Sequence, residues 1–232
     1  KQDMRRATWK TLLVGLCMSV VPFAIQPVAA ANPTPPFISP NASWISTVNY
    51  YRAMAGLPAV TENKTWSTAD VAHSCWMLWN GIAHSETPGT TNYSAAGDQA
   101  GRTGNVAVTT DINATARTFV ELWTTGPFHA IGLLRYNLKT VGYGNCTSTA
   151  TPKWRSAATL DVIHGLVAGT KRPTTPILWP GDGTSTSLTK FKVETPNPLV
   201  YCGGTYPTSG AGLPLMAMMP EAVTTVKTAT IT

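Results

Sequence analysis

The chain has 232 residues, of which 43% are hydrophobic and 12% charged, which is enough apolar content for one ordinary globular domain. Its formal net charge is +6, but residues 32–232 carry only +3, and these charges are scattered along the chain. A charge this small and this dispersed excludes a nucleic-acid-binding protein that depends on a basic surface.

The first 31 residues have the pattern of a cleavable secretory signal. Basic residues within the first ten positions precede an apolar run at 12–25, and small residues then lead to Ala31. A membrane anchor is the alternative, but Pro22 interrupts the run, which falls short of the roughly 18 apolar residues that a spanning helix needs. We therefore expect cleavage after Ala31 and a secreted, extracellular protein that does not span a membrane.

Three cysteines remain after this cleavage: Cys75, Cys146 and Cys202. In an oxidising compartment three cysteines predict one disulfide and one free thiol. The sequence leaves all three pairings open.

The predicted domain begins after a proline-rich leader at residues 32–40. Apolar residues recur at helical spacing from residue 44 to residue 55, which predicts a first helix. Asn41 and Ser43 are candidates for its N-cap, and Gly56 for its end.

A second helix is predicted to open at Ser67, with Asp70 in the capping-box position, and to end at Asn80-Gly81. His73 and Trp76 fall towards one side of it, away from the side that we expect to be buried. That buried side holds four residues: Val71, Cys75, Leu78 and Trp79.

Residues 85–105 are rich in Ser, Thr, Gly and Asn and predict a long loop. A third helix then runs from near Asp111 or Asn113 to Gly126, and a short turn containing His129 follows.

The remaining elements are predicted to be strands. Residues 139–144 and 158–164 form two of them, the second with alternating apolar residues. Residues 170–232 are rich in Pro, Thr and Gly and predict a small β-rich or irregular tail. Three further strand candidates lie in that tail: residues 176–179, 188–193 and 213–219.

Five short blocks, in a fixed order, are similar to a known family. They are Asn49-Tyr50-Tyr51-Arg52 with Gly56-Leu57, Asn80-Gly81 with His84-Ser85, Gly104-Asn105-Val106-Ala107, Trp123-Thr124-Thr125-Gly126-Pro127-Phe128-His129, and Val141-Gly142-Tyr143-Gly144. In these blocks the chain resembles the CAP superfamily of cysteine-rich secretory proteins, antigen 5 and pathogenesis-related proteins, and above all its secreted bacterial branch (SCP-like domains). We place this domain at residues 41–169.

The resemblance implies an α+β fold, an α-β-α sandwich with a short antiparallel sheet between helices. In many relatives a central cleft holds two histidines and two acidic residues and can bind a divalent metal. His84 and His129 match the two histidines. The acidic positions do not match, because Thr103-Gly104-Asn105 stands where relatives read Gly-Glu-Asn, and Thr124-Thr125 stands where many have a glutamate.

Two neutral imidazoles and one carboxylate, with one position left open, suit a zinc ion. We expect His84, His129 and Glu86 to be the ligands, because Glu86 is only two residues past His84. The alternative is that the two histidines bond backbone carbonyls or each other and brace the cleft. Four further residues are predicted to line the cleft: Asn105, Trp123, Asp98 and Glu121. His73 and His164 are expected to be surface or packing residues.

Three functions are compatible with these features. The first is a secreted protein whose cleft binds a divalent metal or a small ligand, without catalysis. The second is a divergent metal-dependent hydrolase of peptide or cell-wall material, with Glu86 as its base. The third is a lipid- or sterol-binding or surface-interaction module, because relatives are reported to bind such lipids and residues 213–219 are apolar. The sequence assigns no catalytic residue, and it favours a non-enzymatic role with a small ligand, a lipid or a cell-surface component as the partner.

Overall fold

A computed structural model describes residues 38–39, 42–151, 153–202 and 210–220, without the side chains of residues 201 and 202. The predicted signal peptide and most of the proline-rich leader lie outside these residues. Among the described residues, no helix has the length and apolar character needed to cross a membrane.

A four-stranded sheet lies at the centre of the domain, with the strand order β1-β3-β4-β2. Strand β1 pairs with β3 in parallel, whereas β4 pairs antiparallel with both β3 and β2. The strands are β1 (Thr61–Glu62), β2 (Gly104–Thr109), β3 (Thr140–Thr147) and β4 (Ser156–Asp161). Strand β4 is buried along its whole length, because helices cover both faces of the sheet there.

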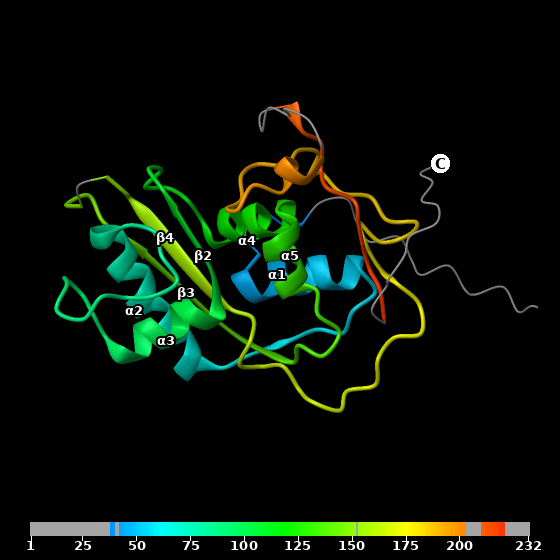
Figure 1. Ribbon diagram of the computed structural model, residues 1–232, viewed down its shortest axis with the longest axis horizontal. Helices are drawn as coiled ribbons and strands as arrows, with labels where there is room; N and C mark the ends of the chain where they lie inside the picture. Colours follow the sequence, from blue (N-terminus) through cyan, green and yellow to red (C-terminus); the bar gives the residue numbers. More distant parts are fainter. Residues whose placement is uncertain (1–37, 40–41, 152, 203–209, 221–232) are drawn as a thin grey trace, which may run out of the picture. The chain divides into compact units, whose positions relative to one another are not determined.

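Helices lie on both faces of this sheet (Figure 1). On one side α2 (Lys64–Asn80) packs against β3 and β4, and α3 (Ala95–Thr103) packs against α2. On the other side α1 (Trp44–Met54), α4 (Ala116–Thr125) and α5 (Pro127–Leu133) share one hydrophobic core with β3 and β4. The predicted α-β-α sandwich is confirmed.

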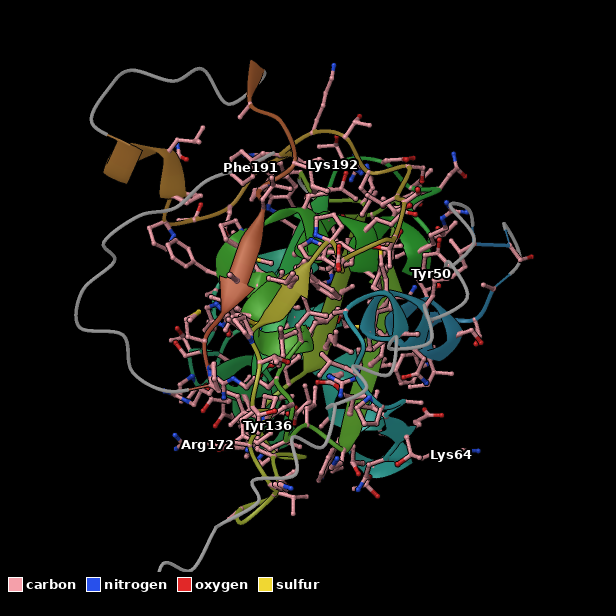
Figure 2. The ribbon with its side chains drawn as sticks, turned by 90° about the vertical axis from the view of Figure 1, so that its right-hand side faces the viewer. Tyr50, Lys64, Tyr136, Arg172, Phe191 and Lys192 are labelled. Carbon is pink, nitrogen blue, oxygen red and sulfur yellow. A yellow bond between two sulfur atoms is a disulfide. The ribbon has the colours of Figure 1, made fainter. Side chains whose placement is uncertain are left out.

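The C-terminal segment contributes a second, small sheet. Strands β5 (Ile177–Trp179) and β6 (Met216–Met218) pair antiparallel and lie side by side in Figure 2. Trp179 is fully buried, and its ring meets Tyr51 of α1 edge-on at 5.5 Å. The small β-rich tail is therefore confirmed, and it packs onto the main core. A 3-10 helix, η1 (Pro198–Cys202), lies between the two strands in the sequence.

The second strand candidate of this segment was wrong. Residues 188–193 form no strand, and only an isolated bridge joins Lys190 to Gly212. Phe191, labelled in Figure 2, is nevertheless buried, and its backbone N–H donates to the carbonyl oxygens of Ala211 and Gly212.

Helix α1 begins as predicted, with Ser43 as its N-cap and its Oγ accepting from the backbone N–H of Ser46. Helix α2 begins three residues before the predicted Ser67, because the Asn63 side chain accepts from two backbone N–H groups and caps it there. Helix α4, by contrast, begins later than predicted, at Ala116, with Thr115 in a capping box.

The buried side of α2 differs from the prediction. Val71 and Trp79 are about two-fifths exposed, at 41% and 42%, whereas His73 and Trp76 are buried. Helix α2 packs against the sheet on one side and against α3 on another, so two of its faces are buried. A single apolar stripe in the sequence does not identify two buried faces. Leu78 is buried as predicted.

Helix α3 and the start of strand β2 lie where the sequence predicted a loop to residue 105. The sequence of α3, AAGDQAGRT, has two glycines and no large apolar residue, so it lacks the pattern of a core-facing helix. The glycines are required by close packing. A Cβ on Gly97 or Gly101 would lie 2.3 Å from Glu86 Oε1 or from the His73 ring.

A disulfide joins Cys75 of α2 to Cys146 of β3, with a Cα–Cα distance of 5.1 Å. This selects one of the three pairings that the sequence left open. The bond closes a loop of 71 residues and ties α2 to the sheet.

Candidate functional site

A cleft of about 280 Å³ opens between the loop after α2, strand β2 and helices α4 and α5. His84, His129 and Trp123 all line it, so the structure brings these three predicted site residues together. Most of the other lining residues are apolar, among them three consecutive residues of β2 at 106–108. The C-terminal segment adds residues 193–195. We call this cavity the histidine cleft.

His84 is held in one tautomer by helix α3. Its Nδ1 lies 2.9 Å from the carbonyl oxygen of Gly101. A carbonyl oxygen only accepts hydrogen bonds, so Nδ1 carries the proton, and in the neutral ring Nε2 keeps its lone pair. His84 thus offers the cleft a hydrogen-bond acceptor or a metal-binding nitrogen.

His129 is held by a carboxylate from the C-terminal segment. It lies in the first turn of α5, and its Nδ1 is 2.6 Å from Oε1 of Glu194, whose side chain is fully buried. The same carboxylate accepts from the backbone N–H groups of Phe128, at 3.0 Å, and of His129, at 2.7 Å. Because three donors converge on Glu194, Nδ1 carries the proton of the neutral ring and Nε2 is again left free.

Gly126 allows Glu194 to approach so closely. A Cβ built on Gly126 would lie 2.7 Å from Oε1 of that carboxylate. Any larger residue at this position would push Glu194 away from the start of α5 and from His129.

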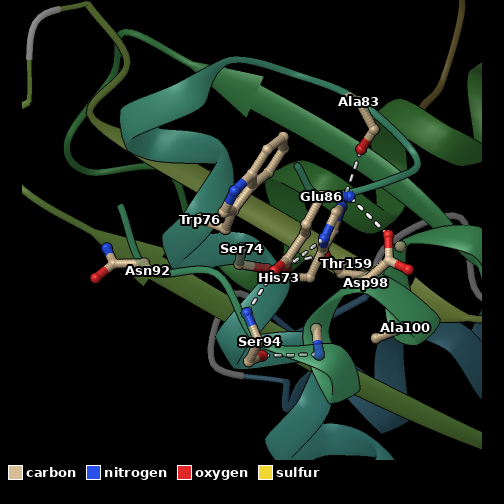
Figure 3. A network of polar contacts seen from close by, with 12 residues as sticks. His73, Ser74, Trp76, Ala83, Glu86, Asn92, Ser94, Asp98, Ala100 and Thr159 are labelled. Carbon is tan, nitrogen blue, oxygen red and sulfur yellow. Dashed lines mark hydrogen bonds and ion pairs between the residues drawn. The ribbon is translucent and has the colours of Figure 1, made fainter. Parts of the chain in front are cut away.

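Glu86 does not join the two cleft histidines, contrary to the prediction. It is buried, its Oε1 lies 3.0 Å from Nδ1 of His73, and its Oε2 accepts from the backbone N–H of Ser94 at 2.8 Å (Figure 3). His73 Nε2 in turn lies 2.9 Å from the carbonyl oxygen of Ala83. Both carboxylate oxygens are therefore occupied in a buried pair that joins α2 to the loop before α3.

The other predicted cleft residues brace the site from outside the cavity. Asn105 Nδ2 donates to the carbonyl oxygen of His129 at 3.1 Å and so holds α5 against β2. Asp98 accepts from the backbone N–H of Glu86 and from Arg102. These donors hold the pKa of the Asp98 carboxyl below its usual range, Arg102 contributing most.

Glu121 also lies outside the cavity. It accepts from the hydroxyl of Tyr51 at 3.0 Å and from Arg117 Nε at 2.6 Å. Burial, together with this carboxylate, raises the pKa of Tyr51. Glu121 therefore stabilises the packing of α4 against α1.

The donor set fits a metal ion only in part. Two imidazoles with Nδ1 fixed by an acceptor are arranged as metal-binding histidines usually are. A third ligand is missing, since Glu86 faces His73 and Glu194 is occupied by His129 and two backbone amides. Throughout the described part of the chain, no three His, Cys, Asp or Glu residues are grouped so that they could hold a metal.

Comparison with known proteins places this site in a family. Residues 45–159 match the model of CAP, the cysteine-rich secretory protein family. The chain is a member of the CAP family. The matched region contains both cleft histidines and ends before Glu194, so the carboxylate that fixes His129 comes from outside the part that the family model matches.

Among solved structures, the CAP chain is similar to an extracellular protein containing a SCP domain from Bacillus anthracis str. Ames. The two are 19% identical, with a TM-score of 0.35 over 51% of this chain. The chain spans 39% of the length of that protein. No curated protein matches the chain.

Sequence reasoning missed Glu194 as a site residue. It is one of three acidic residues after Gly169, and it lies 65 positions from His129 in a stretch without a motif. The only available signal was indirect. His129 follows a Gly-Pro pair, and the carboxylates that relatives place in this cleft are absent here, so its ring needed a hydrogen-bonding partner from elsewhere in the chain.

Proposed function

We propose that the histidine cleft binds a small molecule with an apolar body and a hydroxyl group. The observation that supports this most directly is the pairing of an apolar wall with two imidazoles whose Nδ1 atoms are already bonded. Each ring then has one acceptor nitrogen left. A ligand hydroxyl satisfies such an acceptor, and an alkyl chain fills the apolar remainder of the cleft.

A carboxylate ligand fits this cleft less well. The side chain of Glu194 lines the cavity and is fully buried, so it repels a second carboxylate in a medium where water screens little. Neutral imidazoles also have no N–H left to offer such a group. The cleft is thus expected to discriminate between an alcohol and an acid of the same chain length.

The probes that test this are 1-octanol and octanoate, titrated at a pH of about 8, where ordinary imidazole is neutral. We expect octanol to bind at least about tenfold more tightly than octanoate. NMR of the Trp123 indole reports on this cleft, because Trp123 lines it and its Nε1 donates to the carbonyl oxygen of Val106.

The variant His84→Leu/His129→Leu should bind octanol about tenfold more weakly than the parent protein, because no imidazole nitrogen is left to accept from the hydroxyl group. His164→Leu is the matched control, since it removes a histidine that does not line the cleft. Equal binding of octanol and octanoate to the parent protein would contradict the proposal, as would an unchanged affinity for octanol in the double variant.

A divalent cation is the second candidate ligand, favoured by the fixed Nδ1 atoms of both histidines. His84 and His129 would supply two of its ligands, and a Lewis acid is what such an ion would add to the cleft. With two protein ligands we expect zinc binding to be weak by calorimetry and absent in His84→Ala/His129→Ala. Tight one-to-one binding that the double variant loses would make the metal, rather than an alcohol, the ligand of this cleft.

The hydrolase and surface-module alternatives have less support. Glu86 is bonded to His73 and Ser94, away from the cleft, so it is not placed to act as a base there. The apolar run at residues 213–219 is partly used within the protein, since Met216 and Met218 pack against the main core.

We also propose that the protein is exported. The signal pattern at residues 1–31 supports this, and so does the Cys75–Cys146 disulfide, which is typical of oxidising compartments.

A further inference from the structure

A second cavity, of about 460 Å³, lies between helices α2 and α3. None of its lining residues lines the histidine cleft. Two alanines of each helix face it, three or four positions apart along that helix: Ala69 and Ala72 on α2, and Ala96 and Ala100 on α3. Methyl groups at these positions are too small to fill the space between the helices, so a slot remains open.

One end of this slot has aromatic walls. Trp66 and His164 both line it, and their ring centroids are 5.5 Å apart with an angle of 35° between the planes. Trp66 is half-buried, and the side chain of His164 is 36% exposed. Both rings are therefore accessible to a small molecule that enters the slot.

His164 is held by a buried carboxylate. Asp161 is 1% exposed, and its Oδ1 accepts from the backbone N–H groups of Ile163 and His164, both at 3.0 Å. Its Oδ2 is hydrogen-bonded to His164 Nδ1. Nδ1 therefore carries the proton of the neutral ring, and Nε2 keeps its lone pair.

The same construction occurs at His129 in the histidine cleft. In both places a buried carboxylate accepts from the imidazole Nδ1, from the backbone N–H of the same histidine and from that of the residue before it. In both places the Nε2 atom belongs to a ring that lines a cavity. His164 Nε2 is 3.5 Å from the amide nitrogen of Gln99, which makes a weak hydrogen bond that a ligand can replace.

We propose that this slot is a second ligand site, which binds a small planar aromatic molecule bearing a hydroxyl group. The ligand ring lies between the alanine faces of α2 and α3 and against Trp66. Its hydroxyl donates to Nε2 of His164. The site is independent of the function proposed for the histidine cleft, because the two cavities share no residue.

Phenol is the probe, and benzene is the comparison that lacks the hydroxyl. Titration of the whole protein is followed by NMR of the Trp66 indole and the His164 ring. We expect both signals to shift with phenol, and phenol to bind about tenfold more tightly than benzene, because only phenol donates a hydrogen bond to Nε2. Absence of a shift at these two residues, or equal affinities for phenol and benzene, would overturn the proposal.

Two variants test separately whether binding requires the open slot and whether it requires the hydrogen bond to His164. Ala96→Leu fills the slot from an exposed position and should abolish the shifts of Trp66 and His164 with both probes. His164→Leu should leave benzene bound and remove the advantage of phenol. If His164 only braces the turn after β4, phenol keeps its advantage in His164→Leu and the proposal fails. Ala107→Leu, which fills the histidine cleft, is the control and should leave phenol binding at the slot unchanged.

Discussion

Asp70→Asn is expected to stabilise the protein by about 4 kcal/mol at pH 7, and to have almost no effect at pH 4. Asp70 of α2 is fully buried, and neither of its carboxylate oxygens has a hydrogen-bond partner. Burial, reinforced by the negative charge of Asp161, raises the pKa of Asp70 to about 8. An uncharged amide of the same size avoids the cost of ionising this buried group.

The sign of the effect follows from proton binding. In the unfolded chain Asp70 loses its proton near its ordinary pKa of about 4, whereas in the folded protein it keeps the proton until about pH 8. The folded state therefore binds more protons between these values. Its stability falls as the pH rises, by about 1.4 kcal/mol per pH unit from this group. Above pH 8 the loss is complete.

Chemical denaturation of the parent and the variant from pH 4 to pH 8 measures this difference. Asp98→Asn is the matched control, because its hydrogen bonds lower the pKa of Asp98 and its replacement should instead destabilise the protein at neutral pH. If the free energies of unfolding of the parent and of Asp70→Asn change in parallel with pH, then ionisation of Asp70 does not destabilise the folded protein.

Arg52→Met is expected to destabilise the protein by about 4 kcal/mol. The side chain of Arg52 is fully buried in α1 and donates to the backbone carbonyl oxygens of four residues: Pro58, Leu133, Arg135 and Leu138. Methionine matches much of its volume but donates nothing. Several buried carbonyl groups would then lose their partner at the junction of α1, α5 and the chain before β3.

Arg52 remains charged at neutral pH, although desolvation by burial lowers its pKa to about 10. Arg52→Lys should recover only part of the loss, because an ammonium cannot reach carbonyl groups arranged around a planar fork. Arg102→Met is the control, since the side chain of Arg102 is 55% exposed and water screens its pair with Asp98. A loss no larger for Arg52→Met than for Arg102→Met in thermal unfolding would contradict the expected role of Arg52.

The two dyads, Glu194–His129 and Asp161–His164, show why a histidine cannot be interpreted from its neighbours in sequence alone. Asp161 is three residues from His164, and the sequence nevertheless suggested only a surface or packing role for that histidine. Glu194 is far from His129 in the chain and had no motif. In each case the property that matters is which ring nitrogen is already bonded, and that depends on the carboxylate that folding brings to Nδ1.

His73, unlike His129 and His164, is fully buried and lines neither cavity. It was expected on the outer side of α2, because the apolar residues Val71 and Trp79 suggested where the core lay. The structure buries His73 beside Glu86 and covers both with Gly97 and Gly101 of α3. A buried, hydrogen-bonded pair of polar side chains against two glycines has no hydrophobic periodicity. The sequence pattern therefore indicated neither helix α3 nor the buried side of α2.

The sequence by itself indicated the CAP fold and a shared cleft for His84 and His129, because five short blocks in a fixed order resemble that family and two of them contain these histidines. It also identified the cysteines, but not their pairing. Tertiary structure alone decided that Glu86 turns to His73, that Glu194 reaches His129 from the C-terminal segment, and that a slot remains between α2 and α3. These outcomes depend on how well side chains fill the interior and on which buried donors still need an acceptor. Both are decided only when segments that are distant in the chain pack together.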